Sequence, residues 1–270
     1  MTGGAGFIGS HLIDRLVARG DHVVVLDNLS SGHRSFLQTH LDSGAVTLVE
    51  GDLCNHEDVT RAMSLDIECV FHLAANPDIR LGTRVTDTDL NQGTVATYNV
   101  LEAMRLAGVT KIAFASSSVV YGENAPMPTP ENHGPCMPIS LYGASKQAGE
   151  GLISSWVGTF GFQAWIFRFA NVIGARGTHG VIFDFIHKLK KDPTRLEVLG
   201  NGLQEKSYME VGECRCHPPR DETCNSTAQP LQPWQPRYGF RTSYCRNCGG
   251  GYAMPRRNHR VHRWGQMLGR

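Results

Sequence analysis

The sequence predicts an α/β fold with a doubly wound parallel sheet and a small second lobe. Short β-branched runs alternate with amphipathic segments of about a dozen residues, as in successive β-α-β units. Gly3, Gly6 and Gly9 are spaced by three where an apolar-periodic segment begins. Asp27 ends the next β-branched run, where dinucleotide-binding folds carry an acidic residue. Together these features predict a Rossmann-like domain.

The expected helices and strands follow in a regular order. The first helix begins at Gly6 and ends near Arg19, because apolar residues recur at helical spacing and Gly20 follows. Two further helices are expected at residues 96–108 and 141–161. The expected strands are residues 22–28, 45–53, 69–75, 111–118 and 163–174.

Composition narrows the class of protein. The chain has 270 residues, 41% of them hydrophobic, and a net charge of +1, which predicts neither a nucleic-acid nor a membrane partner. No run of 18 apolar residues and no signal peptide is present, so we expect a cytoplasmic location.

The glycine turn predicts a bound dinucleotide. Spaced glycines permit a tight turn and close approach to a pyrophosphate, and the helix that follows presents free N–H groups. A carboxylate at Asp27 would bind ribose hydroxyls and disfavour a 2′-phosphate, so we expect NAD rather than NADP. Asp52 and Leu53 end the next strand, beside the expected adenine site. The alternative is a purely structural turn with carboxylates that cap helices.

A second group of residues predicts acid–base chemistry. Tyr142 and Lys146 are four apart in an expected helix and therefore share one face. An ammonium near the phenol would bring its pKa from ~10 toward the working range. The strand at 111–118 ends in three serines, at the edge where open α/β sheets bind ligands. A loop with five prolines, residues 121–140, is expected to cover this site.

Several motifs together resemble the extended short-chain dehydrogenase/reductase family of NAD-dependent epimerases and dehydratases. They are TGGAGFIGSHL, LDNLSSG, GDL, HLAA, NVLEA, SSSVVYGE, YGASK and RFANVIG, in the order of that family, and they cover residues 2–213. Within the family, the chain is most similar to the sugar-nucleotide 4-epimerases of the UDP-hexose type.

The resemblance implies a role for each of several residues. Ser117, four residues before Tyr121, would be the catalytic serine, Tyr142 the base, and Lys146 its helper and a ribose ligand. Ser117 would also bind the sugar, together with Asn171 and Lys206. The implied NAD contacts are Gly3, Gly6, Phe7, Ile8, Gly9, Asp27, Asn28, Asp52, Leu53, Leu73, Ala74, Ala75, Tyr142 and Lys146. No metal is expected, and a homodimer through the helix at 141–161 is permitted.

The resemblance also favours epimerisation through a transient 4-keto sugar. Family dehydratases carry Asp-Glu after the catalytic hydroxyl residue, and here Ser118 and Val119 occupy those positions. Neither can act as a general acid or base of that kind. Another sugar-nucleotide oxidoreductase, dehydratase or decarboxylase of the same family stays open as an alternative.

The chain departs from the family in two places within residues 1–213. Gly93 stands where the family has an Asn near the cofactor, and Asn91 is two residues out of register. The family's first strand is missing before the glycine turn. We therefore expect Gly3 and Gly6 to lack an anchor, and the neighbouring strands to expose unpaired edges.

The expected regions are an NAD-binding Rossmann-like domain at 1–165, a partial sugar-nucleotide lobe at 166–213 and an atypical tail at 214–270. The tail is rich in Arg, Pro and Cys, with ten arginines, no lysine and two acidic residues. This is typical of coding sequence read out of frame, so we expect a frameshift near Cys214, or disorder. An inactive truncated product is one alternative.

The tail also allows a metal-binding interpretation. Cys245, Cys248, His259 and His262 could hold a zinc ion, and the arginines would then suit a nucleic-acid partner. The spacing of the histidines is shorter than zinc fingers prefer, and few apolar residues are available to pack around a metal.

Overall fold

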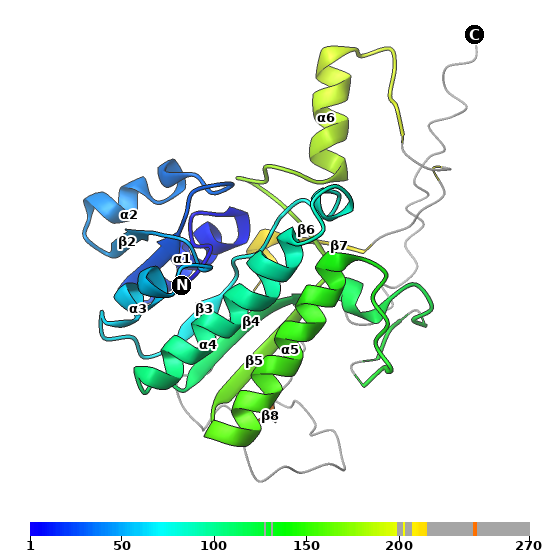
Figure 1. Cartoon of the computed structure of the whole chain (residues 1–270). Helices are drawn as coiled ribbons and strands as arrows, with labels where there is room; N and C mark the ends of the chain where they lie inside the picture. The colour runs from blue at the N-terminus through cyan, green and yellow to red at the C-terminus, as the bar shows by residue number, and fades with distance from the viewer. Residues whose placement is uncertain (127, 131, 199–201, 203–206, 215–239, 242–270) are drawn as a thin grey trace.

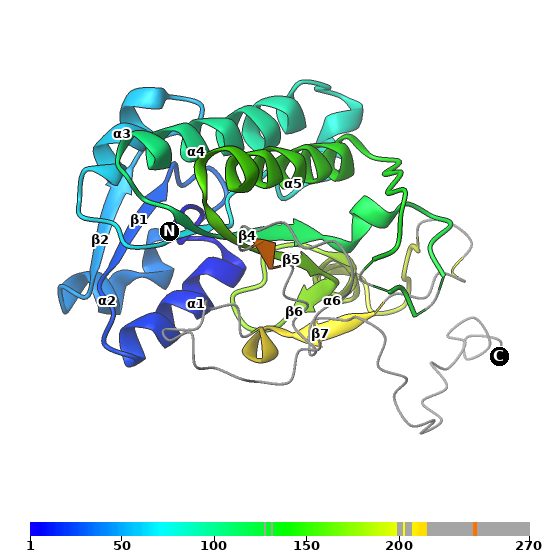
Figure 2. The same cartoon turned by 90° about the horizontal axis from the view of Figure 1, so that it is seen from below.

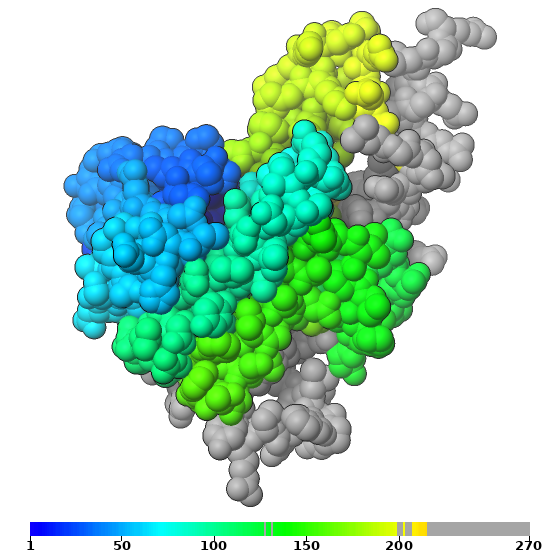
Figure 3. Space-filling view, in the orientation of Figure 1, coloured from blue at the N-terminus to red at the C-terminus, as the bar shows by residue number. Residues whose placement is uncertain are grey.

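The computed structural model describes residues 1–126, 128–130, 132–198, 202, 207–214 and 240–241 (Figures 1 and 3). A parallel sheet runs through this part of the chain, and helices cover both of its faces (Figure 2). The helix α6 (Val181–Lys191) stands out from the body that the sheet and the other helices form (Figure 1). The doubly wound arrangement agrees with the fold class that the sequence predicts.

The main sheet is parallel at every paired step. Its order is β2, β1, Thr2, β3, β4, β5 and β8, because isolated bridges join Thr2 to Leu26 on one side and to His72 on the other. Its strands are β1 (Val23–Asp27), β2 (Val46–Glu50), β3 (Val70–His72), β4 (Lys111–Ser117), β5 (Gln163–Phe169) and β8 (Phe240–Arg241). A separate parallel pair consists of β6 (Asn171–Ile173) and β7 (Tyr208–Glu210).

The helices form two layers. In Figure 2, α3, α4 and α5 lie on one face of the sheet, and α1 and α2 lie on the other. The α-helices besides α6 are α1 (Phe7–Ala18), α2 (Gln38–Asp42), α3 (His56–Met63), α4 (Ala96–Leu106) and α5 (Leu141–Phe160). The 3-10 segments are η1 (Arg34–Phe36), η2 (Leu81–Thr83), η4 (Ser118–Tyr121) and η5 (Val211–Glu213), and η3 (Leu90–Val95) is a π-helix.

Two residues occupy the central position ahead of the glycine turn. Thr2 donates its N–H to Phe71 O (2.9 Å), and Leu26 donates its N–H to Met1 O (2.9 Å). Gly3 donates to Leu26 O (3.1 Å), so the turn is tied to β1. The expectation that the glycine turn lacks an anchor is therefore wrong, because one pair of residues bridges β1 and β3 where the full strand was expected.

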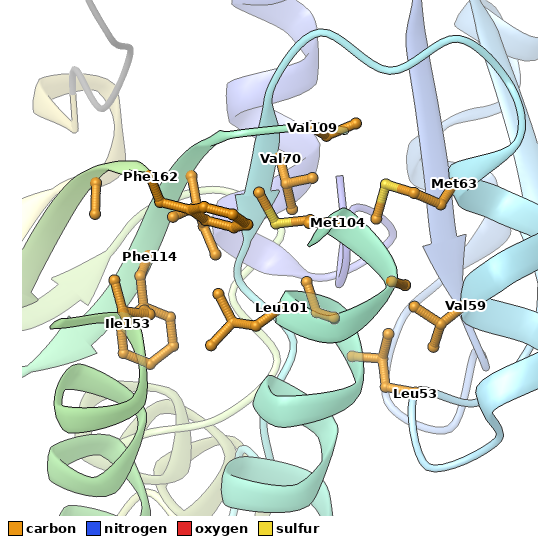
Figure 4. Close-up of a cluster of buried hydrophobic side chains, with 14 of the residues drawn as sticks. Leu53, Val59, Met63, Val70, Leu101, Met104, Val109, Phe114, Ile153 and Phe162 are labelled. Atoms are coloured by element: carbon orange, nitrogen blue, oxygen red, sulfur yellow. The ribbon is translucent and has the colours of Figure 1, made fainter. Parts of the chain in front are cut away.

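The larger hydrophobic cluster lies between the sheet and helices α3, α4 and α5 (Figure 4). Phe114 of β4, Leu101 of α4 and Ile153 of α5 are almost completely buried in it. Burial of each such side chain contributes about 1.5–3 kcal/mol. A second cluster, which includes Ile13 and Phe167, packs α1 against the opposite face. These clusters hold the carboxyl ends of the strands in fixed relation.

The structure differs from the sequence prediction at the end of the fifth strand. The single strand expected at 163–174 divides into β5 and β6, and β6 leaves the main sheet to pair with β7. The helices α2, α3 and α6 were not predicted. Of the tail, the structure describes Cys214 and the two-residue strand β8, which pairs with β5. The origin assigned to the rest of the tail stays a prediction.

Candidate active site

The glycine turn forms a cradle that side chains would fill. Gly3 has φ +67°, and a Cβ added there would lie 2.7 Å from the amide nitrogen of Ala74. At Gly9, an added Cβ would lie 2.8 Å from the Cα of Gly4. Gly6 is the N-cap of α1 and provides no side-chain capping bond to the first turn. Gly3 and Gly9 are therefore required by the close packing of the turn on its own backbone. The turn places the free N–H groups of the first turn of α1 at the carboxyl edge of the sheet, and such groups fit the pyrophosphate of a dinucleotide.

Asp27 connects the end of β1 to that turn. Its Oδ2 accepts a hydrogen bond from Ala5 N (2.9 Å), and its Oδ1 accepts one from Leu29 N (2.9 Å). The carboxylate therefore has a structural role in shaping the turn. Each carboxylate oxygen retains a second lone pair, which leaves Asp27 able to accept a ribose hydroxyl as well.

Asn28, Asp52 and Leu53 follow the ends of β1 and β2. Asn28 donates from Nδ2 to Asp52 Oδ2 (3.2 Å), so the two side chains lie side by side. A backbone hydrogen bond from Cys54 holds the pKa of Asp52 below its usual value. Leu53 is buried, and its carbonyl accepts a bond from Asn99 Nδ2 (2.8 Å). These residues lie together at the carboxyl ends of β1 and β2, and their role as an adenosine site stays a prediction.

The remaining predicted cofactor residues surround the same turn. Leu73, Ala74 and Ala75 follow β3 and are half-buried. Leu73 N donates to Thr2 O (3.2 Å) and Ala74 N to Thr2 Oγ1 (3.3 Å), which joins this segment to the start of the turn. The other two, Phe7 and Ile8, begin α1 and are also half-buried.

The structure brings Ser117, Tyr142 and Lys146 together. Ser117 ends β4, and its side chain lies close enough to the Tyr142 phenol to lower the pKa of that group. Lys146, one turn further along α5, donates from Nζ to Ala115 O (2.7 Å). Its Nζ also lies 5.7 Å from the centroid of the Tyr142 ring. Helix α5 begins at the N-cap Ser140, whose Oγ accepts a bond from Gly143 N (3.0 Å), and this cap fixes where Tyr142 enters the site.

Burial dominates the protonation of this pair. It raises the pKa of Tyr142 to about 12, against the neighbouring Ser117 side chain, which lowers it. Burial also lowers the pKa of Lys146 to about 8, against Asp89 and Glu150, whose charges raise it. The lowered pKa expected for Tyr142 is therefore not found in the protein alone. The ammonium lies over the ring and bonds a carbonyl, while the phenol is withdrawn from water.

The sequence reasoning missed two carboxylates near this pair. Asp89 is buried, and its Oδ1 accepts a bond from Asn76 Nδ2 (3.1 Å), whereas its Oδ2 has no hydrogen-bond partner. Glu150 lies one turn beyond Lys146 on α5 and binds Arg168 of β5. The spacing of four residues from Lys146 to Glu150 could have identified the second, since it puts both on one helix face.

Other predicted residues lie away from this pair or outside the description. Asn171 begins β6, and its Nδ2 donates to Ser207 O (3.2 Å). Lys206 lies outside the described residues. Gly93 lies in the π-helix η3, where an added Cβ would come within 2.5 Å of Ser145 Oγ. Asn91 is exposed and turned toward Asp87, so it does not supply the family's amide.

No group of three or more His, Cys, Asp or Glu side chains among the residues that the structure describes could hold a metal ion. Cys245, Cys248, His259 and His262 lie outside the described residues, so the zinc interpretation is not tested. No helix of the described part is long and apolar enough to span a bilayer.

A parallel sheet whose carboxyl edge has a glycine cradle, the half-buried Tyr142 and the buried Lys146 is typical of proteins that bind a dinucleotide. The chain belongs to the NAD dependent epimerase/dehydratase family, whose model matches residues 1–214. The family resemblance and the expectation of NAD as the family's cofactor are thereby confirmed.

Several individual members of the family are similar to this chain. The chain is 34% identical over 218 residues to the UDP-glucose 4-epimerase of Mycolicibacterium smegmatis, covering 79% of this chain and 69% of that protein. It is similar to a crystal structure of a UDP-galactose 4-epimerase, with 47% identity, a TM-score of 0.71, and 78% and 67% of the two chains covered. It also resembles the Thermus thermophilus UDP-glucose 4-epimerase in complex with NAD, at 32% identity and a TM-score of 0.67, covering 78% and 70%.

Proposed function

We propose that the chain is a sugar-nucleotide 4-epimerase that interconverts UDP-glucose and UDP-galactose with NAD. The observation that carries the proposal is that Ser117, Tyr142 and Lys146 lie together. The Ser117 side chain is close enough to the Tyr142 phenol to lower its pKa, and Lys146 donates to Ala115 O one helical turn away. The names and the cofactor of the similar proteins supply the substrate and cofactor classes.

Each residue of the pair would have a distinct task. Ser117 and Tyr142 would bind the 4-hydroxyl of the sugar between them, and Tyr142 would accept its proton and later return one to it. Lys146 would bind the nicotinamide ribose and favour the ionised form of Tyr142. NAD, when bound, would accept the hydrogen of the sugar C4 and give it back.

The glycine cradle would hold the cofactor for repeated turnovers. Gly3, Gly6 and Gly9 would present backbone N–H groups to the pyrophosphate, and Asp27 would accept the ribose hydroxyls. Asn28, Asp52 and Leu53 would border the adenosine. Asn171 and Lys206 would contact the sugar nucleotide. The segment after Ser117 provides Ser118 and Val119, which offer no carboxylate to expel water, and this favours epimerisation over dehydration.

A homodimer through α4 and α5 is part of the proposal. The outer faces of these helices and of η3 expose large apolar side chains beside a half-buried Trp156. Single exposed apolar residues are ordinary, but a group on adjacent helices is typical of an interface. The exposed residues are Leu90, Val95, Leu106, Leu141 and Phe160.

An assay of the purified full chain tests this function. NAD-loaded protein is incubated with UDP-galactose, and the products are resolved by chromatography. The proposal predicts UDP-glucose at equilibrium with the substrate. A product that has lost water or carbon dioxide from a related nucleotide sugar, with no interconversion of UDP-galactose, would contradict it.

A further inference from the structure

Three consecutive residues of β4 hold three successive turns of α5. Ala115 O accepts the bond from Lys146 Nζ (2.7 Å). Ser116 Oγ donates to Glu150 Oε1 (2.5 Å), and the side chain of Ser117 faces the Tyr142 phenol. The residues held on α5 are therefore spaced by four, on one face of the helix. The candidate active site uses two of these three connections.

The third connection continues into β5 through a two-pronged ion pair. Arg168 donates from Nε to Glu150 Oε1 (2.9 Å) and from Nη2 to Glu150 Oε2 (2.6 Å). Arg168 stands opposite Ser116 in the register of β4 and β5, so both partners of Glu150 come from adjacent strands. The Arg168 guanidinium also lies 4.7 Å from the centroid of the Tyr121 ring, which belongs to η4.

This ion pair is well shielded from water. The side chain of Arg168 is 19% exposed and that of Glu150 12% exposed. Paired N–H···O bonds fix both distance and orientation, which a single charge contact does not. Separation of the two side chains would leave each as an uncompensated, largely buried charge, which is unfavourable. Small rotations of α5 that separate the pair are therefore disfavoured.

The α5 interface combines close backbone approach near the site with apolar packing of Ile153 and Val157 further along the helix. The face toward β4 has Gly149, and the face toward the 121–140 loop has Gly143. Small residues allow close approach but offer few interlocking side chains. The Glu150–Arg168 pair therefore adds a directional contact to the part of α5 where small residues leave rotation and axial register least constrained.

We propose that Glu150 and Arg168 are positioning residues that set the rotation and axial register of α5, so that Tyr142 meets Ser117 and Lys146 meets Ala115 O. The catalytic part of this proposal rests on the proposed function. The positional part does not, because it concerns the geometry of the protein without substrate.

Glu150 also belongs to the set of charges around Lys146. Three titratable groups interact electrostatically with Lys146, namely Glu150 of α5, Asp89 next to η3 and His72 of β3. The ring of Tyr142 also lies beside its ammonium. A neutral residue at 150 would remove one of the two carboxylates that favour the charged form of Lys146. A pH profile therefore reports a change that a purely mechanical support would leave alone.

The test uses full-length protein with 13Cζ-labelled tyrosine, and the Tyr142 resonance is assigned from the signal that Y142F lacks. The variants are E150Q, which removes the charge, R168K, which keeps the charge but lacks the fork, and S116A, which removes one hydroxyl. The control is E102Q, because Glu102 forms an exposed pair with Arg105 (2.7 Å) on α4.

The proposal predicts that E150Q and R168K move the Tyr142 resonance at neutral pH, that S116A moves it less, and that E102Q leaves it in place. Turnover of UDP-galactose by E150Q and R168K falls at least about tenfold, while KM changes less than about twofold. The limb of the E150Q pH profile assigned to Lys146 moves to lower pH, and that of E102Q does not.

Two results would overturn the proposal. One is an unmoved Tyr142 resonance in folded E150Q and R168K, and the other is an equal movement in E102Q. If E150Q and R168K do not fold, S116A decides by the same resonance. If the wild-type protein does not interconvert UDP-galactose, the proposed function fails, and the resonance still decides the positional claim.

Discussion

Helices α5 and α6 show how differently two apolar helices of this chain are used. Helix α5 has six buried residues, a Ser140 N-cap and a left-handed Gly161 at its C-cap. Helix α6 is amphipathic and ends in lysines, yet none of its residues is buried within the described structure. Its exposed apolar residues include Val181, Ile182 and Ile186.

The contrast shows that pattern alone does not decide what a helix does. The apolar face of a helix becomes buried only where other elements pack against it, as β4 and β5 do for α5. Most helical stability in proteins comes from such packing rather than from propensity. The candidate active-site residues Tyr142 and Lys146 lie on α5, the helix that packs against the sheet.

Truncation of one isoleucine in each helix should give the largest difference in stability. Ile153 of α5 is fully buried, whereas Ile186 of α6 is 47% exposed. I153A should lower the free energy of unfolding by about 2–5 kcal/mol, because it leaves a cavity beside Phe114. I186A should change it by less than about 0.5 kcal/mol. Urea unfolding measures both free energies. Equal losses in the two variants would contradict the difference in packing between α5 and α6.

The buried ammonium of Lys146 should make stability depend on pH. Its folded pKa of about 8 lies below the value of 10.5 expected when unfolded, so the unfolded state binds the extra proton between these values. Wild-type stability should therefore rise with pH in this window, by about 1.4 kcal/mol per pH unit relative to K146M. Urea unfolding at pH 7.5 and pH 10 measures the difference. Parallel behaviour of the two proteins would show that Lys146 is not buried as described.

Alanine substitutions at two glycines of α5 should change the stability of the protein in opposite directions. A Cβ at Gly149 would lie 2.8 Å from Cζ of Phe114, while nothing lies within 4 Å of a Cβ at Gly151. G149A should destabilise the protein by about 1–3 kcal/mol through overpacking. G151A should stabilise it by up to about 1 kcal/mol, since alanine favours the helix. Thermal unfolding of both variants measures the two changes. A shift of both melting temperatures in the same direction would contradict the placement of Gly149 against Phe114 and of Gly151 on the open face.

Much of the nucleotide-binding half could be predicted from sequence because local patterns carry it. Gly3, Gly6 and Gly9 form the expected turn, and Asp27 ends the expected strand. Tyr142 and Lys146 share a helix face, as their spacing of four requires. α3 also had an unused signal, since Asn55 caps it by accepting a bond from Glu57 N (3.0 Å).

The rest depends on contacts between distant parts of the chain. The break between β5 and β6 follows from pairing with β7, more than thirty residues later, which no local pattern specifies. The raised pKa of Tyr142 follows from burial, whereas the sequence suggested only the neighbouring charge. The bond of Glu150 with Arg168 joins a helix to a strand, and neither residue alone indicates it.

The central claim is that the phenol of Tyr142 carries the chemistry. The most direct test is the initial rate of UDP-galactose conversion by wild type, Y142F and Y98F, all at the same NAD occupancy. Tyr98 is an exposed residue of α4 whose ring packs edge-on against Trp156 (ring centroids 5.9 Å apart), so its variant controls for loss of a phenol group. The account predicts a loss of at least about a hundredfold in Y142F and an unchanged rate in Y98F. A Y142F protein that turns over at close to the wild-type rate would contradict it.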